Sequence, residues 1–115
     1  MLAGRNYRAK FVMQNAAVAV ANGTAIDVCQ GDNGGHEWLA IQIVGITTAT
    51  ITFEGTIDGT NWVAVQFTSL ASGTAATTAT ADGIYQARVA GLVQVRARIS
   101  AWTAGTITAT AGLLG

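Results

Sequence analysis

The sequence predicts an all-β protein, an antiparallel β-sandwich that is jelly-roll-like, with about eight strands and an extended N-terminal arm. Two observations predict this class. Apolar and polar residues alternate with a period of two over much of the chain, which is typical of strands with one buried face. Short clusters rich in Gly, Asn and Asp separate the alternating runs, and no segment has a convincing helical period of 3.6 residues.

The first strands are expected near residues 16–20 and 25–30, and clearer ones over residues 37–44, 49–54, 62–67, 84–90, 93–99 and 105–110. Alternate side chains of a strand point to opposite faces, so the apolar member of each pair is expected to face the core. These inward residues are Leu39, Ile41, Ile43, Ile51, Phe53, Val63, Val65, Phe67, Tyr85, Ala87, Val89, Val93, Val95, Ala97 and Ile99.

Turns are expected where glycine follows a small polar residue or alanine. Asp58-Gly59 lies between two alternating runs and predicts a structural hairpin turn, because Gly accepts the positive φ of tight turns. Further turns are expected at residues 31–35, 81–83, 90–91 and 104–105. Residues 69–82 have low complexity and predict a long loop with room for one weak strand.

Length and composition limit the classes of function. The 115 residues suit one domain, which we place at residues 16–115 behind an arm of residues 1–15. Only 10% of the residues are charged and the net charge is +0, which argues against binding nucleic acid, because that needs a basic excess. A surface this poor in charge is better suited to burial against other subunits than to a dilute monomer.

The N-terminal arm holds three of the six basic residues. We expect it to contact an acidic partner surface or a second copy of the chain. Its candidate interface residues are Arg5, Tyr7, Arg8, Lys10 and Phe11. Residues 1–26 loosely resemble a signal peptide, but Gln14 and Asn15 interrupt the apolar run. No apolar stretch is long enough to span a membrane, and the lone Cys29 cannot form an intrachain disulfide.

Residues for catalysis or metal binding are scarce. The single histidine, His36, has no nucleophile elbow or recognisable triad around it, and one Cys with one His cannot form a zinc tetrad. Calcium at Asp32, Asn33 and Glu37 is a weaker alternative to a solvated turn, because the carboxylate spacing of known calcium loops is missing. The sequence therefore predicts no enzyme, no cofactor and no metal site.

Trp38 and Trp62 alternate with inward residues and are expected to point outward. An outward tryptophan is costly in water unless something covers it, so covering by a neighbouring subunit or by the chain's own arm is favoured, and stacking on a glycan is the alternative. The candidate interface residues of the outer face are Trp38, Trp62, Arg88, Arg96 and Arg98. For Arg96 and Arg98, an ion pair with Glu54 across strands is the alternative to a partner contact.

Two stretches carry a family resemblance. The first is Thr52-Phe53-Glu54-Gly55-Thr56-Ile57-Asp58-Gly59-Thr60-Asn61-Trp62, and the second is Val89-Ala90-Gly91-Leu92 with Val95-Arg96-Ala97-Arg98. With these stretches, residues 45–110 resemble small β-sandwich virion proteins of tailed bacteriophages. This resemblance implies a capsid decoration (cement) protein on the outer surface of the virion capsid, assembled in the host cytoplasm. The implied partners are the major capsid protein and copies of the chain itself, as a homotrimer.

Two alternatives stay open within the resemblance. One is a carbohydrate-binding or host-adhesion module of a head or tail fibre, and the other is a tail or baseplate component.

Overall fold

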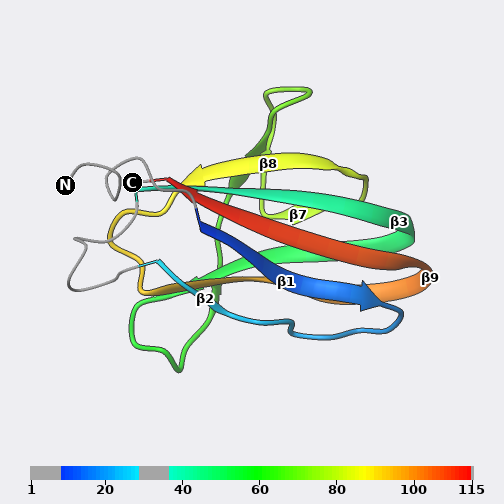
Figure 1. Ribbon diagram of the computed structural model, residues 1–115, viewed down its shortest axis with the longest axis horizontal. Coiled ribbons are helices and arrows are strands. Elements are labelled where there is room, and N and C mark those ends of the chain that lie inside the picture. The colour runs from blue at the N-terminus through cyan, green and yellow to red at the C-terminus, as the bar shows by residue number, and fades with distance from the viewer. Residues whose placement is uncertain (1–8, 29–36, 115) are drawn as a thin grey trace.

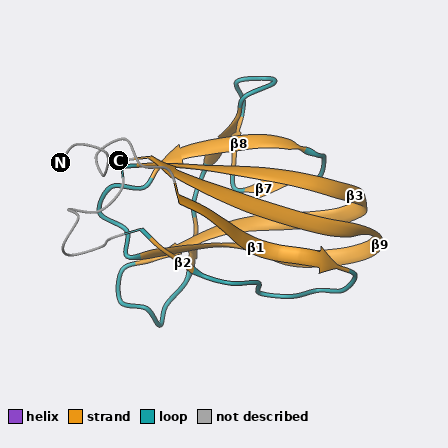
Figure 2. Ribbon diagram, viewed as in Figure 1, coloured by secondary structure: helices purple, strands orange, loops and turns teal. Residues whose placement is uncertain are grey.

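The computed structural model describes residues 9–28 and 37–114, and these residues form only strands, turns and loops (Figure 2). The predicted all-β antiparallel class is confirmed, and the described ranges contain no helix long and apolar enough to cross a membrane. The nine strands are β1 (Ala9–Ala17), β2 (Ile26–Asp27), β3 (Trp38–Thr56), β4 (Val63–Ala64), β5 (Phe67–Ser69), β6 (Ala75–Ala76), β7 (Thr78–Ala79), β8 (Gly83–Arg88) and β9 (Gln94–Leu114).

All nine strands belong to one hydrogen-bonded sheet, which two long strands fold into two layers. β3 and β9 pair antiparallel along their whole length, from Trp38 opposite Leu114 to Thr56 opposite Gln94. This ribbon bends back on itself near its middle (Figure 1). The first layer holds the start of β3, the end of β9, β1 and β8, with β5 and β6 continuing from β8. The second layer holds the rest of β3 and β9 with β2, β4 and β7.

Two glycines make the bend. Gly45 of β3 has φ 92° and Gly105 of β9 has φ 125°, a region that L side chains rarely adopt. A Cβ at Gly45 would overlap the carbonyl oxygen of Thr106, and one at Gly105 would lie 2.5 Å from the carbonyl oxygen of Gly45. Four register shifts accompany the bend between Val44 and Ile51, as expected where bulges bend a strand.

Asp82 fixes the bend from a third element. The loop before β8 places its carboxylate beside β3, where the backbone N–H groups of Gly45 and Ile46 donate hydrogen bonds of 3.1 and 2.8 Å to it. The bend interrupts the pairing of β3 with β9, and the carboxylate gives these two N–H groups acceptors.

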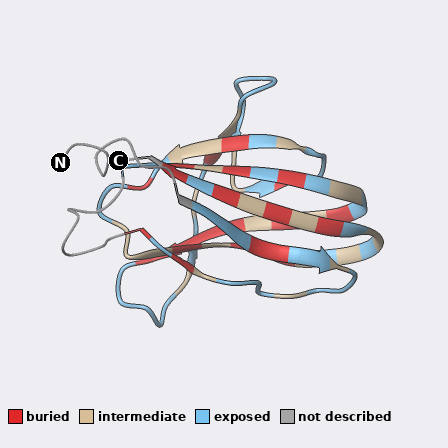
Figure 3. Cartoon of the chain, viewed as in Figure 1, coloured by how far each residue is buried: buried red, intermediate tan, exposed pale blue. Residues whose placement is uncertain are grey.

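The core lies between the two layers, and burial alternates along the long strands (Figure 3). From the first layer come Leu39, Ile41, Ile43, Ile107, Ala109, Ala111 and Leu113, and from the second come Ile51, Phe53, Val95, Ala97 and Ile99. All of the predicted inward residues in β3 are buried, and so are Val95, Ala97 and Ile99 in β9.

An aromatic cluster fills one side of this core. The rings of Phe53 and Phe67 stack with centroids 4.5 Å apart, and Tyr85 lies 5.4 Å from Phe53. The Tyr85 hydroxyl donates a 2.6 Å hydrogen bond to the carbonyl oxygen of Ala81. Burial, with the negative charge of Asp82 as a smaller cause, raises the pKa of the Tyr85 phenol.

Several predicted boundaries are wrong. The turn expected at Ala104-Gly105 lies inside β9, because this glycine bends the strand without reversing it. The strand expected over residues 62–67 is two short strands, β4 and β5. Val63, which was expected to face the core, is 64% exposed on β4, a two-residue strand that pairs with β3 alone. The strand expected over residues 16–20 ends at Ala17.

Residues 9–15 of the predicted arm belong to β1, which pairs with β9, whereas residues 1–8 lie outside the described residues. β1 carries a bulge around Gln14 that turns this side chain inward. The Gln14 amide donates hydrogen bonds to the carbonyl oxygens of Ala21, at 3.1 Å, and Ala97, at 2.9 Å. One side chain thereby ties β1 to the following loop and to the second layer.

Candidate functional site

The described residues contain no group of three or more His, Cys, Asp and Glu side chains that could hold a metal ion. His36 and Cys29 lie outside the described residues, and so do Asp32 and Asn33 of the weaker calcium alternative. The surfaces of the two layers are therefore the features from which a function can be argued.

The outer surface of the first layer carries few charges. Strand register places its side chains in rows that cross β1, β9, β3 and β8. One row holds Val12, Thr110, Gln42 and Ile84, a second holds Gly112, Ala40 and Gln86, and a third holds Thr108 and Val44. We call these nine residues the uncharged face. Val12, Val44 and Ile84 are large apolar residues that remain 43–45% exposed.

Charged residues lie at the ends of these rows. Lys10 is the β1 member of the second row, opposite Gly112. At another margin, Arg88 lies opposite Trp38 and forms a 2.9 Å ion pair with Glu37. Trp38 points outward as predicted and is 42% exposed.

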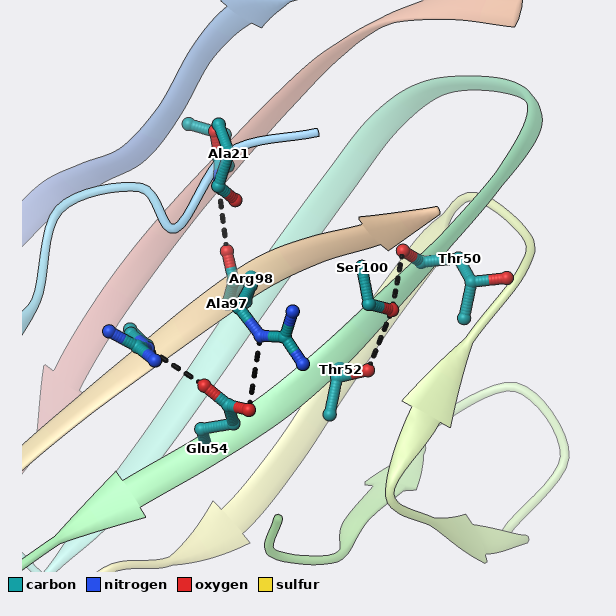
Figure 4. A network of polar contacts seen from close by, with 9 residues as sticks. Ala21, Thr50, Thr52, Glu54, Ala97, Arg98 and Ser100 are labelled. Carbon is teal, nitrogen blue, oxygen red and sulfur yellow. Dashed lines mark hydrogen bonds and ion pairs between the residues drawn. The ribbon is translucent and has the colours of Figure 1, made fainter. Parts of the chain in front are cut away.

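The outer surface of the second layer is built in the opposite way, from hydrogen-bonded polar groups. Glu54 of β3 lies opposite Arg96 of β9, and its carboxylate receives one Nε–H from Arg96 at 2.8 Å and one from Arg98 at 3.1 Å (Figure 4). The ion pairs with Glu54, which the sequence left open beside a partner contact, are thereby present in the structure. Beside them, the hydroxyls of Thr52 and Ser100 share a 2.8 Å hydrogen bond.

Trp62 covers part of this cluster. The central carbon of the Arg96 guanidinium lies 4.2 Å from the centroid of the Trp62 ring, a cation–π arrangement. Trp62 points away from the core, as predicted, and an arginine of the chain itself covers it. We call Trp62, Glu54, Arg96 and Arg98 the arginine cluster.

The predicted turn at Asp58-Gly59 is held by its own aspartate. The Asp58 carboxylate accepts hydrogen bonds from the backbone N–H groups of Thr60 and Asn61, from the Asn61 amide and from the Thr56 hydroxyl. These donors, the Asn61 and Thr60 backbone N–H groups first, hold the pKa of this carboxyl well below its usual range. Gly59 adopts φ 79°, as the turn requires.

A hydroxyl-rich hollow of about 280 Å³ lies at the bend of the ribbon. The side chain of Trp102 lines it and donates a 3.0 Å hydrogen bond to the carbonyl oxygen of Gly105. The other polar side chains are those of Thr47, Thr48, Thr50, Thr80 and Thr103.

The structure separates the predicted interface residues into groups. Trp38 and Arg88 border the uncharged face of the first layer, whereas Trp62, Arg96 and Arg98 lie together on the outside of the second layer. Of the arm residues, Lys10 and Phe11 lie on β1 with exposed side chains. Arg5, Tyr7 and Arg8 lie outside the described residues.

Sequence reasoning missed two polar residues that hold these surfaces in place. Gln14 was noted only as a polar interruption of the apolar run in residues 1–26, in a stretch expected to be an arm. Asp82 was expected only as part of a turn, and its contacts with Gly45 and Ile46 span 37 and 36 positions in the chain. The polar type of the Gln14 and Asp82 side chains is the only sequence signal for these contacts, because the sequence pattern alone does not distinguish a buried or paired polar group from a solvated one.

Comparison with known proteins gives a family and a shared fold. The model of the XepA family matches residues 7–112. The SPBc2 prophage-derived protein YomS has a similar structure, with a TM-score of 0.84 and 18% identity over 95% of this chain and 94% of that chain. The PBSX exported protein XepA gives a TM-score of 0.85 and 16% identity over 94% of this chain, which spans only 38% of XepA. No curated protein matches the chain.

Proposed function

The chain belongs to the XepA family, and we propose that it is a phage-associated structural protein without catalytic activity that binds other subunits of a phage particle. Its fold is shared with a protein derived from the SPBc2 prophage and with an exported protein of PBSX, which supports the phage origin.

The uncharged face is the observation that carries this proposal. Small monomeric proteins usually intersperse charges over their surface, and a patch with exposed valine and isoleucine marks a contact site. The charged residues of the first layer, Lys10, Glu37 and Arg88, lie at the margins of this patch, so a partner can cover its centre without desolvating a charge. The patch extends across four strands, which suits a broad protein surface better than a small ligand.

The finer assignment that we propose is a capsid decoration (cement) protein, bound as a trimer to the outside of the major capsid shell. A protein that binds only the assembled shell stabilises it by mass action, because its binding free energy is lost when the shell comes apart. Symmetric copies on a closed shell each repeat the same contact, so a modest interface area for each copy is sufficient for the whole set to stabilise the shell.

The test compares phage particles with and without this chain. Deleting its gene should lower the temperature at which heated particles release their DNA, and its copy number in normal particles should approach that of the major capsid protein. Particles of unchanged heat resistance, or a copy number of only a few per particle, would contradict the decoration role and favour a tail or baseplate location.

A matched pair of variants tests the uncharged face itself. Gln42→Lys places a charge in the middle of the uncharged face, whereas Ala71→Lys places the same charge at an exposed position in the turn between β5 and β6. We expect Q42K to be lost from purified particles and A71K to be retained. Equal incorporation of both variants would show that this face is not the contact surface.

A second candidate function is that of an exported protein that acts away from the particle, and the description of the PBSX protein as exported favours it. Separating particles from the medium after lysis distinguishes the two. Recovery of the chain in the particle pellet supports a structural role, whereas recovery in the medium supports the exported role. A host-adhesion module would stay with the particles but leave their heat resistance unchanged, with Trp38 as the exposed aromatic for a glycan.

A further inference from the structure

The arginine cluster has one more positive than negative charge. Arg96 and Arg98 carry two guanidinium charges, and Glu54 supplies one carboxylate that both of them share. The side chain of Arg96 is only 17% exposed, that of Arg98 is 33% exposed and that of Glu54 is 10% exposed. A partly desolvated charge without a counterion is costly, so the cluster is suited to receiving one further anionic group.

Hydrogen-bond donors are also left over. Each guanidinium has five N–H donors, and both arginines use Nε to reach Glu54. No described residue accepts a hydrogen bond from the Nη atoms of either arginine. These atoms form the outer edge of each planar group, the edge that binds a carboxylate in a bidentate manner.

Both guanidinium groups are held in place before any ligand binds. Arg96 and Arg98 are two positions apart on β9, so they extend from the same face of the strand about 7 Å apart. Glu54 fixes the Nε edge of each, and the Trp62 ring supports the plane of Arg96. A preorganised pair loses little side-chain entropy on binding, which raises the affinity for a matching anion.

The surroundings favour a single carboxylate over a polyanion. Asp27 lies on the neighbouring strand and accepts a 2.7 Å hydrogen bond from Gln94, which is two positions before Arg96. Asp58, whose low pKa keeps it ionised, lies in the turn that leads to Trp62. These two negative charges would repel an extended phosphate chain, and the net charge of the protein is +0.

We propose that the arginine cluster is a binding site for one carboxylate of an aspartate or glutamate side chain on a partner protein. The site belongs to the second layer and is distinct from the uncharged face of the first. Only the identity of the partner, a subunit of the phage particle, rests on the proposed function. The carboxylate binding itself can be measured on the isolated chain.

The experiment titrates ¹⁵N-labelled protein with sodium acetate at constant ionic strength and follows the Arg Nε–H and Trp indole N–H signals by NMR. We expect saturable shifts for Arg96, Arg98 and Trp62, with no such change in sodium chloride. Inorganic phosphate and a long polyphosphate serve as competing anions. Non-saturable shifts with acetate, or polyphosphate binding tighter than acetate, would overturn the proposal.

Variants separate a binding role from a structural one. Arg98→Gln should weaken acetate binding about tenfold, the effect of losing one charge-assisted hydrogen-bond donor group, and Arg98→Lys should weaken it while keeping the charge. Arg88→Gln is the matched control, because it removes an arginine whose side chain is 64% exposed and which pairs with Glu37 on the other layer. If R98Q folds and binds acetate as well as R88Q does, the site is refuted, whatever the outcome with phage particles.

Discussion

Replacing Gly45 with alanine tests the bent ribbon on which both faces depend. A new Cβ would overlap the carbonyl oxygen of Thr106 on β9, and the backbone φ of 92° is unfavourable for any L side chain. The left-handed φ costs about 1–2 kcal/mol. Relieving the overlap by moving the backbone costs about 1–3 kcal/mol more. Alanine recovers about 0.4–1 kcal/mol by restricting the unfolded chain, so we expect a net loss near 3 kcal/mol.

Gly91 provides a control with almost the same backbone angle. Its φ is 95°, and a Cβ there would meet nothing within 4 Å. Gly91→Ala should therefore incur the cost of the φ angle alone, a net loss of about 1 kcal/mol. Gly112→Ala on β9 has neither an unfavourable φ nor a neighbour within 4 Å, and we expect it to be neutral or slightly stabilising.

The assay is urea unfolding followed by tryptophan fluorescence and far-UV circular dichroism, at two protein concentrations to detect self-association. Thermal unfolding followed by the same two probes gives a second readout. For a chain of this length, each kcal/mol lost from the free energy of unfolding lowers Tm by about 4 °C, so G45A should melt about 12 °C below the parent and about 8 °C below G91A. If G45A and G91A are equally stable, β3 and β9 do not approach each other at Gly45, and the two-layer arrangement is wrong.

Three further predictions follow from the core and the turn. Phe53→Ala removes a fully buried ring that stacks on Phe67 and should cost about 3–5 kcal/mol in the same unfolding assay. Gln14→Ala removes the donor to the buried Ala97 carbonyl oxygen and one of two donors to the Ala21 carbonyl oxygen, and it should cost about 1–3 kcal/mol, whereas a solvated glutamine would cost almost nothing. The lowered pKa of Asp58 means that its carboxylate stabilises the turn at neutral pH and that this contribution is lost only as the pH falls through the folded-state value. A ¹³C NMR titration should place the Asp58 midpoint well below the ordinary value of about 3.9, and an ordinary midpoint would contradict the hydrogen-bonded turn.

In the proposed function, the two faces of the sandwich make two kinds of contact. The centre of the uncharged face can be covered without desolvating charge, so it suits a broad contact whose strength comes from buried area. The arginine cluster offers directed hydrogen bonds to one anionic group, so it suits a contact that fixes orientation. Because the layers share β3 and β9, both surfaces are held at a fixed distance by one folded ribbon.

The long strands of both layers were predictable because the sequence signal for a strand is local. A strand alternates its side chains between two faces, so Leu39, Ile41 and Ile43 identify themselves as core residues from their spacing alone. The Asp58-Gly59 turn is local in the same way, since all of its hydrogen bonds lie within three positions of Asp58.

The sequence by itself determined the β class and the inward side of the long strands, because these depend on residue type and on a period of two. For Arg96 and Arg98 it left both an ion pair with Glu54 and a partner contact open. Only the tertiary structure decided that residues 38–56 are one strand, that Gly45 and Gly105 bend it against its partner, and that Trp38 and Trp62 lie on different layers. These features arise from contacts between residues some 60 positions apart, such as Gly45 with Gly105, and the register of such contacts is set by the packing of the whole core.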